Sequence, residues 1–214
     1  LIIGGGPSGL SSAIKVKQLA SAEGKDVSVC VLEKGSEIGA HILSGNVFEP
    51  TALNELIPDW KEKEAPLNSP ATKDIVKFMI SENSSINIPF PSFLIPTFNN
   101  HGNYVMSLAN FTRWLATQAE SLGVEIFPGF TAAEVIFEEN VVKGVLTGEM
   151  GISKDGEKKP SYQPSMELRG KYTVFAEGCR GHLGKQLIKK FNLDENRDPQ
   201  HYGIGFKEIW DISP

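Results

Sequence analysis

The sequence has little cysteine, little positive charge and no long hydrophobic run. Its two cysteines, Cys30 and Cys179, lie far apart in 214 residues, which excludes a disulfide framework and a paired metal site. No stretch approaches the roughly 20 apolar residues that a membrane-spanning helix needs. The formal net charge of −5 makes nucleic acid a poor partner, because phosphate binding requires clustered lysine and arginine. The remaining composition, 40% hydrophobic and 22% charged, predicts a globular protein.

The chain also lacks an initiating methionine and a recognisable signal peptide. It starts directly in a strand-like segment and stops at Trp210–Pro214 without the usual end of a domain. We read the sequence as a piece of a longer protein, so that a targeting segment would be missing rather than absent.

One internal segment lacks charge altogether. From Asn83 to Thr112 there is no Asp, Glu, Lys or Arg, and its first half is rich in aromatic, aliphatic and proline residues. Pro89, Pro91 and Pro96 exclude a helix interior and a central strand, so Ile86–Phe98 within this segment is expected to be neither. The alternatives are a loop that packs its apolar side chains on the core and a loop that exposes them.

A glycine-rich turn opens the sequence. The stretch LIIGGGPSGL contains Gly4-x-Gly6-x-x-Gly9 directly after a buried strand at Leu1–Ile3. Gly4 allows a tight turn, Gly6 lets a pyrophosphate approach the backbone, and Gly9 allows close helix–strand packing. The N-terminus of the following helix offers free N–H groups to the phosphates. A second strand at Val27–Leu32 completes a βαβ unit, so the pattern predicts a dinucleotide-binding fold.

An acidic residue ends the second predicted strand, and a second glycine turn follows much later. Glu33 stands where a carboxylate can accept hydrogen bonds from both ribose hydroxyls of an adenosine; the alternative is a solvent-facing side chain. The stretch Val174–Leu187 reads as strand, Gly178 turn and helix, which would bring further N–H groups to a ligand as long as FAD; the alternative is an ordinary βα turn. The expected cofactor contacts from these patterns are Gly4, Gly6, Pro7, Ser8, Gly9, Glu33, Lys34 and Gly178.

The rest of the chain reads as short helices and strands. Ser107 is expected to cap a helix that Gly123 closes. The predicted elements are a loop and short helix within Gly39–Trp60, a helix at Leu108–Leu122, a strand at Val124–Phe127, a hairpin of Thr131–Glu138 with Val141–Leu146, a polar loop at Gly151–Pro164, a strand at Met166–Ala176 and a helix at His182–Phe191.

Several stretches together resemble the electron transfer flavoprotein–ubiquinone oxidoreductase family. They are GGGPSGLSSAIKVKQLA, VLEKGSEIGAHILSGNVFEP, LIPDWKEKEAPLN, NNHGNYVMSL, GVEIFPGF, KDGEKK, FAEGCRGHLGKQL and YGIGFKEIW, and they span essentially the whole chain. The resemblance implies an α/β fold: an FAD-binding Rossmann-like domain of the glutathione-reductase type, interleaved with a sheet domain like that of p-hydroxybenzoate hydroxylase. It implies an FAD-binding domain at residues 1–73 and 104–200, and an incomplete quinone- and membrane-facing domain at 74–103 and 201–214.

By the same resemblance, the full-length protein passes electrons from reduced electron transfer flavoprotein to ubiquinone through FAD and a 4Fe–4S cluster. Such a cluster needs four cysteines, which this chain lacks, so the cluster and the quinone-head contacts are implied to lie beyond Pro214. Ser44 and Gly45 are implied to lie near the flavin. We assign no acid, base, nucleophile or metal ligand, and expect each histidine to be structural and Cys179 to be buried and inert.

The apolar tail of ubiquinone links the charge-free segment to a membrane. We expect a loop that dips into the bilayer and submerges Phe90, Phe93, Leu94, Ile95 and Phe98. Four or five such side chains would contribute on the order of 5–10 kcal/mol. Val47–Trp60 is a second candidate surface, with Phe48, Leu53, Leu56, Ile57 and Trp60. The implied location is peripheral: the matrix side of the inner mitochondrial membrane in a eukaryote, or the cytoplasmic membrane in a bacterium.

The residues leave two other classes open. An NAD(P)H-dependent flavin monooxygenase or prenyl reductase would share the architecture, and a non-catalytic FAD-binding or assembly protein would need no electron donor. Four clustered cysteines beyond residue 214 would favour the quinone enzyme over the first class. Flavin reduction by reduced electron transfer flavoprotein would exclude the second.

Overall fold

A computed structural model describes residues 1–43, 45–88 and 99–204. The predictions for Ser44 and for Phe90, Phe93, Leu94, Ile95 and Phe98 lie outside the described residues. The described helices are α1 (Pro7–Ala22), α2 (Thr51–Leu56), α3 (Leu108–Ser121) and α4 (His182–Phe191).

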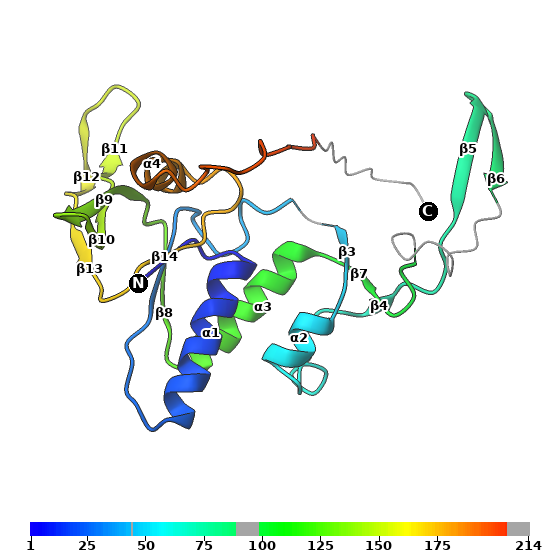
Figure 1. Ribbon diagram of the computed structural model, residues 1–214, viewed down its shortest axis with the longest axis horizontal. Coiled ribbons are helices and arrows are strands. Elements are labelled where there is room, and N and C mark those ends of the chain that lie inside the picture. The colour runs from blue at the N-terminus through cyan, green and yellow to red at the C-terminus, as the bar shows by residue number, and fades with distance from the viewer. Residues whose placement is uncertain (44, 89–98, 205–214) are drawn as a thin grey trace.

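A parallel sheet forms the centre of the molecule. It contains, in spatial order, β14 (Val174–Phe175), β1 (Ile2–Ile3), β2 (Cys30–Glu33) and β8 (Glu125–Pro128). Successive strand residues face opposite sides, so Ile2 and Val31 pack under α1 and α3, while Ile3 and Leu32 pack toward α4. Both faces of the central strands are therefore buried at Ile2, Ile3, Val31 and Leu32, which explains why these four residues are apolar. Figure 1 shows α1 and α3 side by side.

The remaining strands form smaller antiparallel units. One sheet has the order β13 (Glu167–Arg169), β10 (Val141–Thr147), β9 (Ala132–Glu138), and another has β3 (Asn46–Phe48), β7 (Tyr104–Met106), β4 (Ser69–Pro70). Two hairpins stand alone: β5 (Val76–Ser81) with β6 (Ser84–Ile88), and β11 (Met150–Ile152) with β12 (Lys158–Gln163). The predicted βαβ unit, the 131–146 hairpin and the long helices are confirmed.

The helix ends follow the local sequence. Pro7 stands in the first turn of α1, where its missing N–H is not needed, and Gly24 follows the helix with a φ of +63°. The Ser107 side chain accepts a hydrogen bond from the Asn110 N–H at 3.3 Å, as a helix cap does. The cap at Ser107 was predicted from residue type and position alone.

Two predictions between residues 151 and 176 are wrong. The polar loop at Gly151–Pro164 is the hairpin β11–β12, whose Asp155–Gly156 turn has a φ of +84° at the glycine. The single strand at Met166–Ala176 is two strands, because the chain leaves the β10 ladder after Arg169 and then joins β1. An apolar pattern does not reveal such a change of sheet.

The charge-free segment is also partly misread. Its first residues form β6, because Ser84–Ile88 precede the first proline at Pro89. The side chains of β6 are exposed, so this described part does not pack on the core. In Figure 1 the hairpin β5–β6 projects away from the main sheet.

The second candidate membrane surface, Val47–Trp60, is wrong for its main side chains. Leu53, Ile57 and Trp60 are 3%, 3% and 5% exposed and belong to the core cluster with α1 and α3. Trp60 meets Tyr104 edge to face and donates its indole N–H to Asn54 Oδ1 at 2.7 Å. These apolar residues are accounted for by packing.

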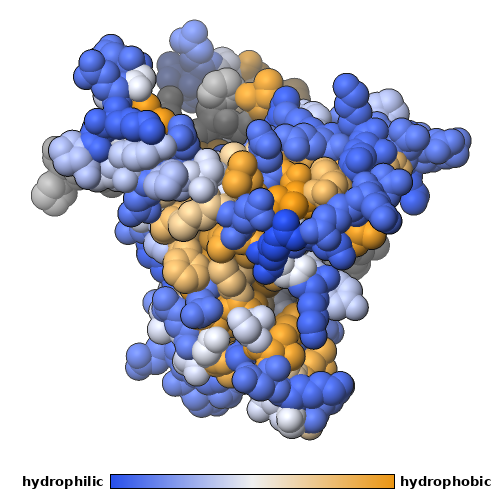
Figure 2. All heavy atoms as spheres, turned by 90° about the vertical axis from the view of Figure 1, so that its left-hand side faces the viewer, coloured by the Kyte–Doolittle hydropathy of each residue, from blue (hydrophilic) through white to orange (hydrophobic). Residues whose placement is uncertain are grey.

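The molecular surface is not uniformly polar. Figure 2 shows the face that lies on the left of Figure 1, with apolar side chains in its middle and hydrophilic ones toward its margins. Strands on this side carry exposed apolar residues, among them Phe127, Val141 and Val174. Within the described ranges, no helix is both long and apolar enough to span a bilayer.

Candidate functional site: a cleft between two glycine turns

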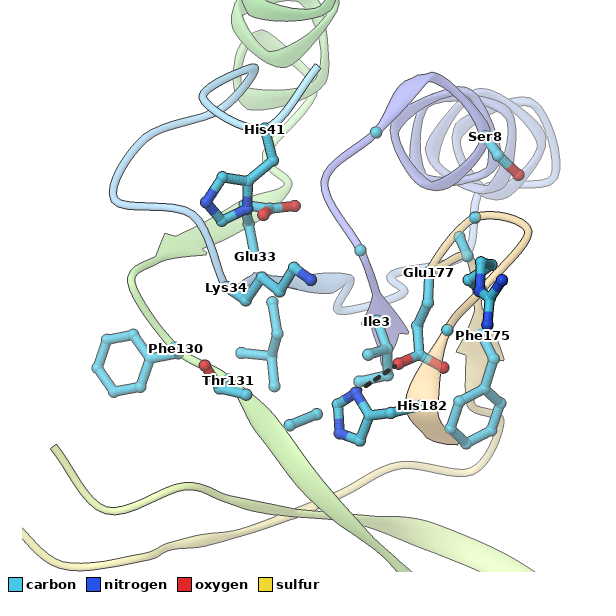
Figure 3. Close-up of a pocket in the computed structure, with 18 of the residues that line it drawn as sticks. Ile3, Ser8, Glu33, Lys34, His41, Phe130, Thr131, Phe175, Glu177 and His182 are labelled. Carbon is cyan, nitrogen blue, oxygen red and sulfur yellow. Dashed lines mark ion pairs between the residues drawn. The ribbon is translucent and has the colours of Figure 1, made fainter. Parts of the chain in front are cut away.

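A cavity of about 690 Å³ lies at the carboxyl ends of β1, β2 and β14 (Figure 3). This is the edge at which parallel α/β sheets bind ligands. The predicted residues in its wall are Gly4, Gly6, Pro7, Ser8, Glu33, Lys34 and Gly178. Gly9 lies behind the wall in α1, and Gly45 is not among the lining residues. The structure thus brings most of the predicted set together, and their contact with a cofactor stays a prediction.

The first turn is tight at two glycines and open at the third. A Cβ on Gly4 would lie 2.4 Å from the Ala176 carbonyl oxygen, and a Cβ on Gly9 would lie 2.0 Å from the Gly4 oxygen. A Cβ on Gly6 would meet nothing within 4 Å. Gly6 is also the N-cap of α1, which has no side-chain cap and no acidic residue in its first turn. The open space at Gly6 leaves room for an anion, and the free N–H groups and the positive end of the helix dipole would attract it.

The Glu33 carboxylate is held by backbone donors. The Gly5 N–H donates to Glu33 Oε2 at 2.8 Å, and the Gly35 N–H donates to Oε1 at 2.7 Å. Each carboxylate oxygen keeps a lone pair after these bonds, so the group can still accept two hydroxyl donors. A Cβ on Gly5 would lie 2.5 Å from the Ile38 Cδ1 atom. Sequence reasoning missed Gly5 and Gly35 as orienting donors, although the triple glycine was a signal for the first.

The second turn differs because its helix is capped by the chain itself. Glu177 accepts hydrogen bonds from the N–H groups of Leu183 (3.3 Å) and Gly184 (2.8 Å), in the first turn of α4. Its carboxylate also pairs with His182 Nδ1 at 3.3 Å, the dashed line in Figure 3. A Cβ on Gly181 would lie 2.4 Å from the Glu177 Cβ atom, so a side chain there would displace Glu177.

This arrangement corrects part of the prediction for Val174–Leu187. Gly178 and Arg180 do line the cavity, but two first-turn N–H groups of α4 are bonded to Glu177 rather than open to a ligand. Glu177 and His182 were missed as wall residues. A carboxylate a few residues ahead of a helix start was the available signal for the cap.

The other polar candidates have mixed outcomes. His41 lines the cavity and its side chain is exposed. Cys179 is exposed, so the expectation that it is buried is wrong; it stands in the second turn, outside the sheet core. Burial raises the pKa of the half-buried Cys30 thiol, which therefore stays protonated and packs as an apolar residue. Among the residues that the structure describes, no three His, Cys, Asp or Glu side chains are close enough to hold a metal ion.

Comparisons with families and solved structures agree with this geometry. Residues 2–57 match the family model described as NAD(P)-binding Rossmann-like domain. The geranylgeranyl bacteriochlorophyll reductase-like protein of Thermoplasma acidophilum superposes with a TM-score of 0.56, at 19% identity over 86% of this chain and 40% of that one. THI4 of Thermovibrio ammonificans superposes with a TM-score of 0.54, at 18% identity over 90% of this chain and 62% of that one. These likenesses establish the mixed α/β Rossmann-like fold.

Relatives at much higher identity match the chain throughout. The electron transfer flavoprotein-ubiquinone oxidoreductase of Pseudomonas aeruginosa is 60% identical over 100% of this chain, which spans 39% of that protein. The mitochondrial protein of the same name from Homo sapiens is 51% identical over 99% of this chain, which spans 34% of it. Over its whole length, the chain is therefore a homologue of the N-terminal part of the electron transfer flavoprotein–ubiquinone oxidoreductases.

Proposed function

We propose that this chain is the FAD-binding part of an enzyme that carries electrons from reduced electron transfer flavoprotein to ubiquinone. The observation that carries the proposal is the cleft of about 690 Å³, in which an oriented Glu33 carboxylate stands beside the uncapped N-terminus of α1. This donor and acceptor set suits a dinucleotide: hydroxyls toward the carboxylate and phosphates toward the helix.

The chain's own residues bind and orient the cofactor. Glu33 accepts hydrogen bonds from the adenosine ribose, and Gly6 with the first turn of α1 receives the pyrophosphate. Gly178 and Arg180 form the opposite wall. The bound FAD supplies chemistry that joins one-electron donors to a two-electron acceptor. Because the protein positions the cofactor and does no proton chemistry of its own in this scheme, no residue of the chain is assigned as catalytic.

The division into domains follows the same proposal. Residues 1–73 and 104–200 form the FAD-binding domain, and residues 74–103 and 201–214 contribute to a quinone- and membrane-facing domain. The burial pattern supports the boundary between residues 73 and 74. Leu67, before the boundary, is buried, whereas strands β5 and β6, after it, are almost wholly exposed. The 4Fe–4S cluster is placed in the part of the full-length protein that this chain does not include.

The hairpin β5–β6 is the proposed membrane-facing surface, with the charge-free segment that continues from it. Phe78, Met79 and Ile80 are 62%, 60% and 58% exposed, and Ile86 and Ile88 follow on the paired strand. Full burial of such a side chain contributes about 1.5–3 kcal/mol, so a few are enough for peripheral attachment. The location is the matrix side of the inner mitochondrial membrane in a eukaryote, or the cytoplasmic membrane in a bacterium.

The test uses the full-length protein purified with its coenzyme. We expect bound FAD, its reduction by reduced electron transfer flavoprotein, and electron delivery to a ubiquinone analogue in liposomes. A protein that stays colourless when FAD is offered would contradict the proposal. Flavin reduction by NAD(P)H, and not by electron transfer flavoprotein, would favour the monooxygenase or prenyl reductase instead.

The membrane surface is tested separately by sedimentation with liposomes. Phe78→Asp with Ile80→Asp, and Phe93→Asp with Leu94→Asp, should each release the full-length protein. Leu122→Asp at the C-cap of α3 is a control, since Leu122 is exposed but far along the chain from the hairpin. Equal sedimentation of all variants would sink the membrane assignment and leave the FAD site untouched.

A further inference from the structure

The hairpin β5–β6 has few contacts of its own to fix its direction. Every residue of its two strands except Val76 is exposed. Two described segments lie between the hairpin and the small sheet β3-β7-β4 in the sequence: residues 71–75 join β4 to β5, and residues 99–103 lead into β7. We call these two segments the neck. The direction of the hairpin depends on how firmly the neck is held.

Hydrogen bonds hold the two sides of the neck together. The Ala71 N–H donates to the Asn103 oxygen at 2.8 Å and extends the β4–β7 ladder by one bond. Nearer the hairpin, Asn100 donates twice to Asp74: its N–H to Oδ2 at 3.1 Å and its amide Nδ2 to Oδ1 at 2.7 Å. These two donors from Asn100 hold the pKa of the Asp74 carboxyl below its usual range, so the group is charged at neutral pH.

Asn100 is itself held in place by a turn. The Asn103 N–H donates to the Asn100 backbone oxygen at 3.0 Å, and the Asn103 amide donates to Asn100 Oδ1 at 3.4 Å. Gly102, between them, has a φ of +92°, which favours glycine. The stretch NNHGNY therefore builds a rigid holder for one side chain, a role that the cofactor site does not explain.

We infer that Asp74 and Asn100 are positioning residues that fix the direction of the hairpin relative to the FAD cleft. The inference rests on the proposed function, in which the hairpin meets the membrane and the cleft binds FAD. A fixed neck would keep the flavin at one distance from the membrane surface where quinone enters. Asp74 is the charged partner of this pair. The other titratable side chains in the neck are His101 and Lys73. The hydrogen bonds to the Asp74 carboxylate come from Asn100 and not from these two residues.

The test measures the distance between two spin labels in the full-length protein. The labels are placed at Asn83→Cys in the hairpin turn and at Glu120→Cys on α3, with Cys30→Ser and Cys179→Ser in the background. Asn100→Asp places two carboxylates next to each other, and we expect the distribution of distances between the labels to broaden. Asp74→Asn combined with Asn100→Asp should restore a narrow distribution, because an amide at position 74 can then donate to the carboxylate at 100. Asn87→Asp on β6 makes the same chemical change away from the neck and should leave the distance narrow.

A second readout separates positioning from folding. Asn100→Asp should keep its FAD content and its flavin reduction by reduced electron transfer flavoprotein, while quinone reduction in liposomes falls and the double variant regains it. A distance as narrow in Asn100→Asp as in Asn87→Asp overturns the inference. The membrane proposal fails by a different result, namely liposome binding that Phe78→Asp with Ile80→Asp does not weaken, and that result leaves the distance measurement valid.

Discussion

The two glycine turns of the cleft look alike in sequence and differ in what their helices offer. Each runs from a strand of the parallel sheet through glycines into a helix, and Gly9 and Gly184 occupy the third position of α1 and α4. The first helix begins at Pro7, and no side chain makes a capping hydrogen bond at its N-terminus. The second begins under the Glu177 carboxylate, which accepts two of its N–H groups. A strand–glycine–helix pattern therefore predicts a ligand site only where no nearby carboxylate already occupies the helix end.

Gly9→Ala and Gly184→Ala should give the largest difference between the turns. Helix propensity alone predicts that each stabilises by about 0.5–1 kcal/mol. The Cβ at position 9 would lie 2.0 Å from a backbone oxygen, whereas at position 184 the nearest atom is 3.7 Å away. We expect Gly9→Ala to lower the free energy of unfolding by about 1–3 kcal/mol, and Gly184→Ala to preserve or raise it. Equal midpoints in urea would contradict the tight packing of the first turn.

Gly6→Ala should separate binding from stability. Its Cβ meets nothing within 4 Å, so the free energy of unfolding without cofactor should not change. The added methyl group stands where the pyrophosphate is proposed to approach, and FAD affinity should fall about 10- to 100-fold. Titration of the apoprotein with FAD, followed by flavin fluorescence, measures this. Unchanged FAD affinity would contradict the proposal that the pyrophosphate binds at the first turn.

Exchanging each carboxylate for an amide compares the two acids directly. Glu33→Gln should weaken FAD binding roughly 10- to 100-fold, because hydrogen bonds to a charged group are worth about 1.5–3 kcal/mol. Glu177→Gln should instead lower the free energy of unfolding by about 0.5–2 kcal/mol, the usual effect of losing a helix cap. Flavin titration and thermal unfolding of both variants decide whether the roles are divided in this way. If Glu177→Gln proves the worse binder, Glu177 contacts the cofactor after all.

His182→Gln should have the smallest effect. The imidazole is half exposed and pairs with Glu177 at 3.3 Å, and an exposed pair of this kind contributes only about 0.2–1 kcal/mol. We expect nearly unchanged unfolding and FAD binding at neutral pH. A large loss of affinity in the same flavin titration would assign His182 to the cofactor site.

The sequence revealed the elements whose signals are local. The first βαβ unit follows from Gly4-x-Gly6-x-x-Gly9 and from strands that are apolar on both faces. The cap at Ser107 is likewise a one-residue signal. These predictions needed no knowledge of distant contacts.

The predictions that failed depended on neighbours from other parts of the chain. In the hairpin β11–β12, strand β11 has only three residues and strand β12 is polar and largely exposed, so neither strand has an apolar period to detect. The predicted strand breaks between β13 and β14 because β13 pairs with β10 in the antiparallel sheet and β14 pairs with β1 in the parallel sheet. The Glu177 cap spans six or seven residues of a folded turn, and Leu53, Ile57 and Trp60 are buried only because α1 and α3 cover them. Burial of an apolar residue cannot be told from exposure until its partners are known.

The contact between Gly4 and Ala176 also constrains the order of events during synthesis. Strand β1 pairs with β14, and the Gly4 backbone fits against the Ala176 carbonyl group, although the whole of the intervening chain separates them in sequence. A ribosome must therefore release the second turn before the first can close, and such distant pairings form slowly. The first glycine turn therefore lacks one wall of its nucleotide cleft until the chain has been made as far as the second turn.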